Sequence, residues 1–364
     1  MNLLQRTLAA IEPPAEAAAE AARRRQDTLT KPPGSLGRLE ELSVQLAAIT
    51  GQARPKLGRA AIIVMAADHG VAAEGVSAYP AEVTPQMVLN FLRGGAAINV
   101  LARHVGARIV VVDMGVAAEL PRADGLVSAK MALGTASMAR GPAMSREQAG
   151  RCLETGIEVL EREAAWGLDP STGSGLGLVA AGDMGIGNTT AASAITAAIC
   201  GQPPERVTGR GTGVDDAGLR RKVEVVRRAL EVNRPDPTDG LDVLSKVGGF
   251  EIGGMAGVML GAAARRIPVL LDGFIAGAAA LVAATLCPGV KPYLIAAHRS
   301  VEAGHAVALQ HLGLRPILDL ELRLGEGTGA ALAIPIVQAA AKVLDEMATF
   351  GEAGVSEAAT KEPR

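Results

Sequence analysis

Five short, unbroken apolar runs constrain the fold of this 364-residue chain more than any other feature of its sequence. Helical patterns and polar turns separate the runs, and an Asp lies at or just beyond the carboxyl end of four of them. The runs cover residues 60–67, 108–113, 176–181, 267–272 and 292–297. Such continuous apolar strands are typical of a parallel sheet that is buried on both faces. The sequence therefore predicts an α/β fold with helices on both faces of a parallel sheet. Its polar residues should gather at the carboxyl edge, where such sheets bind ligands.

The charge balance and the cysteines exclude several kinds of partner. The chain has 36 basic and 38 acidic residues, a net charge of −2 and no long basic run. Binding to a nucleic-acid backbone needs clustered Lys and Arg, so we expect no nucleic acid as the main partner. Cys152, Cys200 and Cys287 form neither a CxxC pair nor a Cys/His ligand spacing. We therefore expect no disulfide framework and no zinc site.

The amino-terminal region differs from the rest of the chain. Its first 26 residues are charged and lack the apolar segment of a signal peptide, and apolar stretches such as 276–286 are too short to span a bilayer. We expect a cytoplasmic protein with no membrane association. Residues 15–26 and 35–50 have helical patterns, and the strand pattern begins near residue 58.

One carboxylate, Glu326, lies between two glycines in the segment LRLGEGTGAAL of residues 322–332. An apolar run passes into a helical one at this point, and side chains at such a turn project from the carboxyl edge of a sheet. The flanking glycines allow a sharp bend and the close approach of a ligand. Glu326 is thus a candidate active-site group; the alternative is a solvated residue that favours a helix N-terminus.

Two glycine-rich turns are candidates for binding a phosphate. Residues 182–193 (GDMGIGNTTAAS) follow a strand and open a helix, where backbone N–H groups suit an anion. The alternative is a tight turn with Asn188 or Thr189 capping the helix. A second cluster at residues 208–218 precedes Lys222, which either contacts a phosphate or is an ordinary solvated helix lysine.

The segment after the first apolar run contains further candidates. His69 could be a general base, but we favour a turn histidine hydrogen-bonded to backbone. Tyr79 and Gln86 would suit a pocket for a planar heterocycle. Methionines in and near the runs are expected to fill the core, namely Met65, Met87, Met114 and Met184.

Eight segments, in order along nearly the whole chain, resemble the nicotinate-nucleotide–dimethylbenzimidazole phosphoribosyltransferase family of cobalamin lower-ligand synthesis. They include ADHGVAAEGVSAYP, GDMGIGNTT, GRGTGVDD and LRLGEGTGAALA, and cover residues 30–40, 67–103, 182–190, 209–216, 248–257, 269–283, 297–305 and 322–333. The resemblance implies transfer of the 5-phosphoribosyl group from nicotinate mononucleotide to 5,6-dimethylbenzimidazole, with inversion at the anomeric carbon. The products would be α-ribazole 5′-phosphate and nicotinate.

The resemblance also implies an architecture. It comprises a Rossmann-like catalytic domain over residues 58–330, a small helical domain from residues 1–57 and 331–364, and a homodimer. No cofactor or metal is implied, because no pyrophosphate leaves.

The resemblance assigns roles residue by residue. The catalytic base falls on Glu326, and the second active-site carboxylate falls on Asp183. This is a departure, since the family motif has Glu where GDMGIGNTT has Asp. The shorter side chain leaves its contact with substrate open. The phosphate site falls on Gly185, Gly187, Asn188, Thr189, Lys222 and Ser300. The benzimidazole pocket falls on Gln86, Ser77, Tyr79, Met184 and Leu324.

The chemistry suits these residue types. Nicotinate leaves from a ring nitrogen that is already cationic, so the step lacks only a stronger nucleophile. A carboxylate that takes the N–H proton of the benzimidazole supplies it, and burial beside Leu322 and Leu324 would raise the pKa of Glu326 for this task. Two alternatives stay open: a magnesium-dependent enzyme that uses phosphoribosyl pyrophosphate, and a nucleotide-sensing domain that releases no nicotinate. Asp215-Asp216, the adjacent acidic pair, follows a glycine turn and not a strand, unlike the first alternative.

Overall fold

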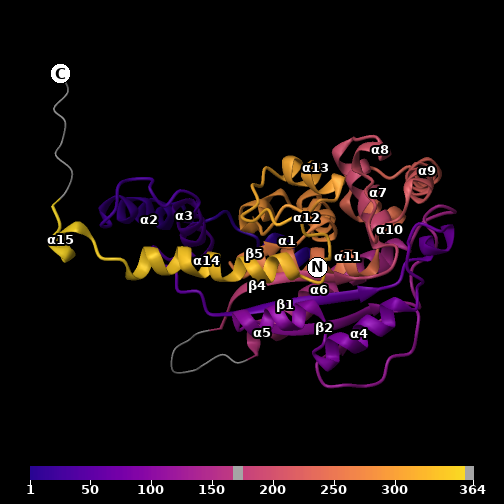
Figure 1. Cartoon of the computed structure of the whole chain (residues 1–364), viewed down its shortest axis with the longest axis horizontal. Helices are drawn as coiled ribbons and strands as arrows, with labels where there is room; N and C mark the ends of the chain where they lie inside the picture. Colours follow the sequence, from indigo (N-terminus) through magenta and orange to yellow (C-terminus); the bar gives the residue numbers. More distant parts are fainter. Residues whose placement is uncertain (167–174, 357–364) are drawn as a thin grey trace. The chain divides into compact units, whose positions relative to one another are not determined.

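The computed structural model describes residues 1–166 and 175–356 of the chain, which divides into two compact units (Figure 1). The first unit contains residues 1–12 and 58–334, and the second contains residues 13–57 and those from 335 onward. The sequence placed residues 1–12 in the helical domain, which is wrong. Helix α1 (Leu3–Ala9) packs on α6 (Arg146–Ala165) in the first unit, because Leu4 is buried there. The hydroxyl of Tyr293 also donates to the carbonyl of Glu12 at 2.8 Å.

Six strands of the described residues form one parallel sheet with the order β3-β2-β1-β4-β5-β6. Their bounds are β1 Arg59–Ala67, β2 Arg108–Gly115, β3 Leu126–Ser128, β4 Leu176–Met184, β5 Val269–Leu271 and β6 Leu294–Ala296. This is the strand order of the Rossmann fold. The five apolar runs correspond to β1, β2, β4, β5 and β6, so the α/β prediction is confirmed. The sequence missed β3, a three-residue edge strand that is only partly buried and therefore leaves no apolar run.

Helices cover both faces of the sheet. Met65 of β1 and Met114 of β2 lie against Gly254 of α11 (Phe250–Ala264) on one face. Ile62 faces the opposite side, as the alternation of a strand requires, and lies close to Ile98 of α5 (Ala97–Val105). The other helices of this unit are η1 Gly70–Glu74, α4 Val83–Arg93, α7 Asn188–Cys200, α8 Pro204–Val207, α9 Asp216–Asn233, α10 Gly240–Val247, α12 Phe274–Leu286, η2 Pro288–Tyr293 and α13 Ala303–Leu312. Because helices cover both faces of the sheet, we expect a ligand to bind at the carboxyl ends of the strands.

The second unit is helical. It contains α2 (Glu16–Thr28), α3 (Arg38–Thr50), α15 (Phe350–Ala353) and the part of α14 (Thr328–Glu346) that follows Ile334. Ala22, Ala47 and Leu344 form its small core. An ion pair of 2.8 Å joins the buried Lys31 to the partly buried Glu40.

Helix α14 is long and apolar enough to cross a membrane, although the sequence led us to expect no such segment. However, 56% of its apolar stretch is buried inside the protein. Its apolar character is therefore that of a helix that packs within a protein core.

Candidate active site

Buried polar side chains gather where four neighbouring strands end. Asp68 follows β1, Asp183 is the last residue but one of β4, Asp272 follows β5 and His298 lies just beyond β6. The strands β1, β4, β5 and β6 are adjacent in the sheet, so their carboxyl ends meet along one edge. Burial of so many titratable groups at one edge is typical of a functional site and not of a structural core.

Glu326 lies in the loop before α14 and exposes only 5% of its surface. Its backbone adopts the left-handed conformation with φ of +63°, which is unusual for a residue with a side chain. Oε2 accepts the backbone N–H of Ile98, in the first turn of α5, at 3.2 Å. Oε1 makes no hydrogen bond to the described part of the chain. The alternative of a solvated carboxylate is therefore wrong, and one oxygen remains available to a ligand.

Burial raises the pKa of Glu326, and the charge of Asp272 raises it further, against the effect of the Ile98 hydrogen bond. The direction is the one that the sequence led us to expect, but Leu324 is not the cause, since that side chain is 57% exposed. The loop instead packs directly on β4. A Cβ on Gly182 would lie 2.3 Å from the carbonyl oxygen of Glu326, so only glycine permits this approach.

Asp272 fixes the backbone around Glu326. Its two carboxylate oxygens accept the N–H groups of Gly327 at 3.1 Å and Ala330 at 2.9 Å, at the start of α14. It is fully buried, and burial raises its pKa, while His298 and these backbone bonds act in the opposite direction. The sequence marked Asp272 as the end of an apolar run but did not predict this contact with a loop 55 residues away.

Asp183 lies beside the same loop. Oδ1 accepts the side-chain amide of Asn188 at 3.0 Å, and Oδ2 is buried without a hydrogen-bond partner among the described residues. Burial raises the pKa of Asp183 well above its ordinary value, and the charges of Asp272 and Glu251 add to the effect. A Cβ on Gly325 would lie 3.0 Å from Oδ1, so the structure brings the two predicted carboxylates, Asp183 and Glu326, to one region.

His69 has a different partner from the one that the sequence favoured. Its Nε2 lies 2.6 Å from Oε1 of Glu251, and both side chains are buried. The interpretation of its ring as bonded to backbone is therefore wrong, because the partner is a carboxylate on α11. The side chain of His69 lies against the turn of Gly185 and Gly187. The His69–Glu251 pair therefore packs beneath the candidate phosphate turn.

Two of the predicted phosphate residues, Lys222 and Thr189, contact each other. This lysine is fully buried on α9, and Nζ donates to Oγ1 of Thr189 at 2.7 Å. The alternative of a solvated helix lysine is wrong. Burial lowers the pKa of Lys222 to about 8, and the charge of Glu302 acts against this shift. A Cβ on Gly211 would lie 2.8 Å from Nζ, so the second glycine cluster covers the ammonium group.

The turn between β4 and α7 is not closed by a side-chain cap. Gly187, with φ of +100°, is the N-cap residue, so Gly185 and Gly187 carry the bend. Asn188 bonds to Asp183, and Thr189 accepts from Lys222. The capping alternative for Asn188 and Thr189 is therefore wrong.

Ser300 belongs to a buried network that the sequence did not predict. Its backbone N–H donates to Nδ1 of His305 at 2.9 Å, and its Oγ accepts the N–H of Glu302 at 3.3 Å. Burial lowers the pKa of His305 to about 3, so this ring is neutral and acts as an acceptor. Oε1 of Glu302 accepts the N–H of Gly211 at 2.9 Å, which links Ser300 to the Lys222 region.

The predicted benzimidazole residues are more open. Tyr79 is 56% exposed, Leu324 is similarly exposed, and Gln86 lies on the exposed side of α4. Ser77 is 3.2 Å from Oγ1 of Thr212, beside the second glycine cluster, and Met184 at the end of β4 is partly buried. These five residues stay a prediction.

Three kinds of comparison identify the family of this chain. The fold and its buried carboxylate edge define an α/β enzyme, and residues 11–355 match the model of a protein family described as phosphoribosyltransferase. This chain is 64% identical to the nicotinate-nucleotide–dimethylbenzimidazole phosphoribosyltransferase of Chloroflexus aggregans and 65% identical to that of a Roseiflexus strain (RS-1). Each alignment covers 98% of this chain and 99% of the relative. The crystal structure of CobT from Thermus thermophilus matches with a TM-score of 0.89 and 53% identity, over 94% of this chain and 100% of that one. The chain belongs to the nicotinate-nucleotide–dimethylbenzimidazole phosphoribosyltransferase family.

Proposed function

We propose that this chain transfers the 5-phosphoribosyl group of nicotinate mononucleotide to 5,6-dimethylbenzimidazole, forming α-ribazole 5′-phosphate and nicotinate in cobalamin synthesis. The observation that carries the proposal is the carboxylate of Glu326. It is buried, one oxygen is held by the N–H of Ile98, and the other makes no hydrogen bond to the described residues. A group held in this way can orient an incoming N–H and accept its proton.

The reaction follows from this carboxylate. One nitrogen of the benzimidazole attacks the anomeric carbon, and the bond to nicotinate breaks with inversion. The electron pair of that bond neutralises the cationic ring nitrogen of nicotinate. The other benzimidazole nitrogen gives its proton to Glu326. The raised pKa of Glu326 makes it a better base than an exposed carboxylate. Proton transfer of this kind contributes about 10²–10⁴-fold, and alignment of the two substrates adds to it.

The phosphate of the nucleotide would lie at the buried ammonium of Lys222. Thr189 and Ser300 supply hydroxyl groups, while Gly185, Gly187 and Asn188 form the turn at the start of α7. The base would lie on the more exposed side, among Gln86, Ser77, Tyr79, Met184 and Leu324. Asp183 would help to hold the loop of Glu326 and keep Asn188 in place. We further propose a homodimer in the cytoplasm, with residues 13–57 and those from 335 onward as its small helical domain.

The direct test is to incubate the protein with nicotinate mononucleotide and a panel of bases and to identify the products by mass. We expect free nicotinate and the ribazole phosphate in equal amounts, with activity that persists in excess chelator. Turnover only with phosphoribosyl pyrophosphate and magnesium would assign the chain to the alternative reaction. Binding of the nucleotide without release of nicotinate would indicate a sensing role.

A further inference from the structure

Glu302 is a buried carboxylate that neither the base chemistry nor the phosphate contacts require. It lies between β6 and α13 and exposes 6% of its surface. Oε1 accepts the backbone N–H of Gly211 at 2.9 Å, whereas Oε2 is buried and has no hydrogen-bond partner among the described residues. A buried carboxylate oxygen without a partner is costly, so its presence calls for a donor that arrives with a ligand.

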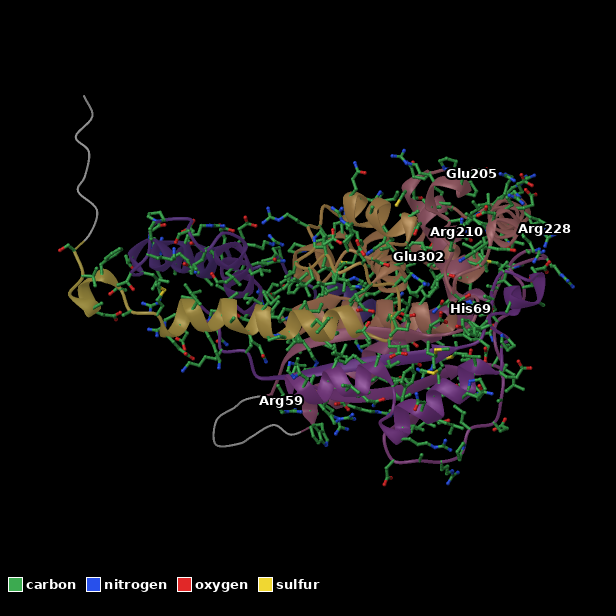
Figure 2. All side chains as sticks on the ribbon, in the orientation of Figure 1. Arg59, His69, Glu205, Arg210, Arg228 and Glu302 are labelled. Carbon is green, nitrogen blue, oxygen red and sulfur yellow. The ribbon has the colours of Figure 1, made fainter. Side chains whose placement is uncertain are left out.

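The loop of residues 208–211 surrounds this oxygen closely. A Cβ on Gly209 would lie 2.1 Å from Oε2, so only glycine allows the backbone to approach the carboxylate in this way. The hydroxyl of the preceding residue, Thr208, is also buried without a hydrogen-bond partner within the described ranges. Figure 2 shows Glu302 beside the loop that carries Arg210. One acceptor and one hydroxyl are thus both unused at the same loop.

The position of Glu302 relative to Lys222 indicates what kind of ligand this is. The charge of Glu302 acts on the buried lysine, and Gly211 contacts both groups. The ammonium nevertheless donates to Thr189. A carboxylate so close would repel a bare phosphate. The carboxylate of Glu302 would favour binding only if another part of the same ligand donates hydrogen bonds to it from hydroxyl groups.

We propose that Oε2 of Glu302 accepts a hydrogen bond from a hydroxyl of the ribose whose 5-phosphate lies at Lys222, so that Glu302 is a specificity residue for ribose over deoxyribose. This inference rests on the proposed function, because it places the phosphoribosyl group at Lys222. Acidic side chains bind ribose hydroxyls in the same manner in dinucleotide-binding folds. A ligand that lacks the hydroxyl would leave the carboxylate unpaired, and sites of this kind discriminate strongly against such analogues.

The first test uses the unaltered protein and measures binding by calorimetry without acceptor base. Ribose 5-phosphate is compared with 2-deoxyribose 5-phosphate, and nicotinate mononucleotide with its 2′-deoxy and 3′-deoxy analogues. Binding is preferred to rate, because a 2′-hydroxyl also changes the reactivity of the anomeric carbon. We expect at least one deoxy analogue of the nucleotide to bind about ten- to a hundredfold more weakly. Equal affinities within each pair, or no binding of any pentose phosphate, would overturn the proposal without any variant.

The second test uses Glu302→Gln with Glu205→Gln as the matched control. Glu205 is an exposed residue of α8, three residues before Thr208, and the control removes the same charge outside the site (Figure 2). In Glu302→Gln the preference for ribose should fall to about threefold or less, because the charge-assisted bond is lost. Inorganic phosphate should bind as tightly as before or more tightly, and the control should retain the full preference. A uniform loss for ribose, deoxyribose and inorganic phosphate would instead assign Glu302 a purely structural role.

These outcomes separate the two proposals. Ribose discrimination without transfer to dimethylbenzimidazole would reject the proposed function and keep the role of Glu302. Transfer without discrimination would reject only the role of Glu302.

Discussion

The carboxylate of Asp272 accepts the backbone N–H of Gly327 at 3.1 Å and thereby holds the residue that directly follows Glu326. The second oxygen of Asp272 accepts the N–H of Ala330 at 2.9 Å. Asp272, which follows β5, thus accepts two backbone N–H groups at the start of α14 that have no partner within the helix. These bonds fix the left-handed turn at Glu326. Glu326 therefore depends on a residue that does not itself need to touch the substrate.

Replacement of Asp272 by Asn should separate positioning from binding. The amide can accept only one of the two N–H groups, and its NH₂ would face the other. This leaves a buried donor unpaired at a cost of about 1–3 kcal/mol. We expect kcat to fall by about 10²-fold, because Glu326 loses its alignment, while the KM for nicotinate mononucleotide changes little. The melting temperature should also fall. The exposed Asp319→Asn serves as the control, and a normal kcat in Asp272→Asn would contradict the positioning role.

Glu326→Gln should remove the base and keep the fold, because the amide oxygen can still accept the N–H of Ile98. We expect turnover to fall by about 10²–10⁴-fold, with nicotinate mononucleotide still bound. In the unaltered protein, kcat/KM should decline as the pH falls through the raised pKa of Glu326, because only the ionised carboxylate accepts a proton. That acidic decline should be absent from the variant.

Glu321→Gln, in the exposed part of the same loop, is the control for Glu326→Gln. Its rate and its pH profile should match those of the unaltered protein. Near-normal rates in Glu326→Gln would assign the base to another group.

The sequence predicted those parts of the site that follow strands or that glycines mark. Five of the six strands were visible as apolar runs, and Asp183 stood at the carboxyl end of one of them. Glu326 stood out because glycines flank it. These signals are local, since alternation, burial of a strand and turn chemistry involve neighbouring residues only.

Contacts between distant residues were not visible. His69 pairs with Glu251, 182 positions away, and Glu302 bonds to Gly211, 91 positions away. The full burial of Lys222 was equally hidden, because α9 is amphipathic and places this one lysine toward α7. Only the folded chain brings such groups together, and no pattern of spacing encodes their pairing.

Asp183→Asn should be more stable than the unaltered protein, and the difference should grow as the pH rises. The pKa of Asp183 is raised in the folded state, so the folded chain binds more protons than the unfolded chain above the ordinary aspartate pKa of about 3.9. The unaltered protein therefore loses stability as the pH rises through the raised pKa. Asn cannot ionise, and its oxygen can still accept the amide of Asn188. The difference in melting temperature should be small below about pH 4 and favour the variant increasingly at higher pH.

Asp236 offers a control of opposite sign for Asp183→Asn. Its backbone and side-chain hydrogen bonds with Thr238 lower its pKa. Asp236→Asn should therefore lose stability relative to the unaltered protein as the pH rises. A melting temperature for Asp183→Asn that is unchanged or lower at every pH would show that ionisation of the buried Asp183 does not destabilise the folded protein.

The affinity for nicotinate mononucleotide should depend on the charge of Lys222. Its pKa is lowered to about 8, so the ammonium group is cationic below this pH and becomes neutral above it. The phosphate is already a dianion there, since its second pKa is about 6. Between about pH 7 and pH 9 the dissociation constant should therefore rise, by up to about tenfold per unit once the pH exceeds the lysine pKa. Lys222→Met should bind the nucleotide weakly and without this dependence, yet bind free dimethylbenzimidazole normally. Arg220→Met, on the exposed side of α9, should behave like the unaltered protein. A dissociation constant that stays level across this pH range, or an equal loss for both ligands in Lys222→Met, would place the phosphate elsewhere.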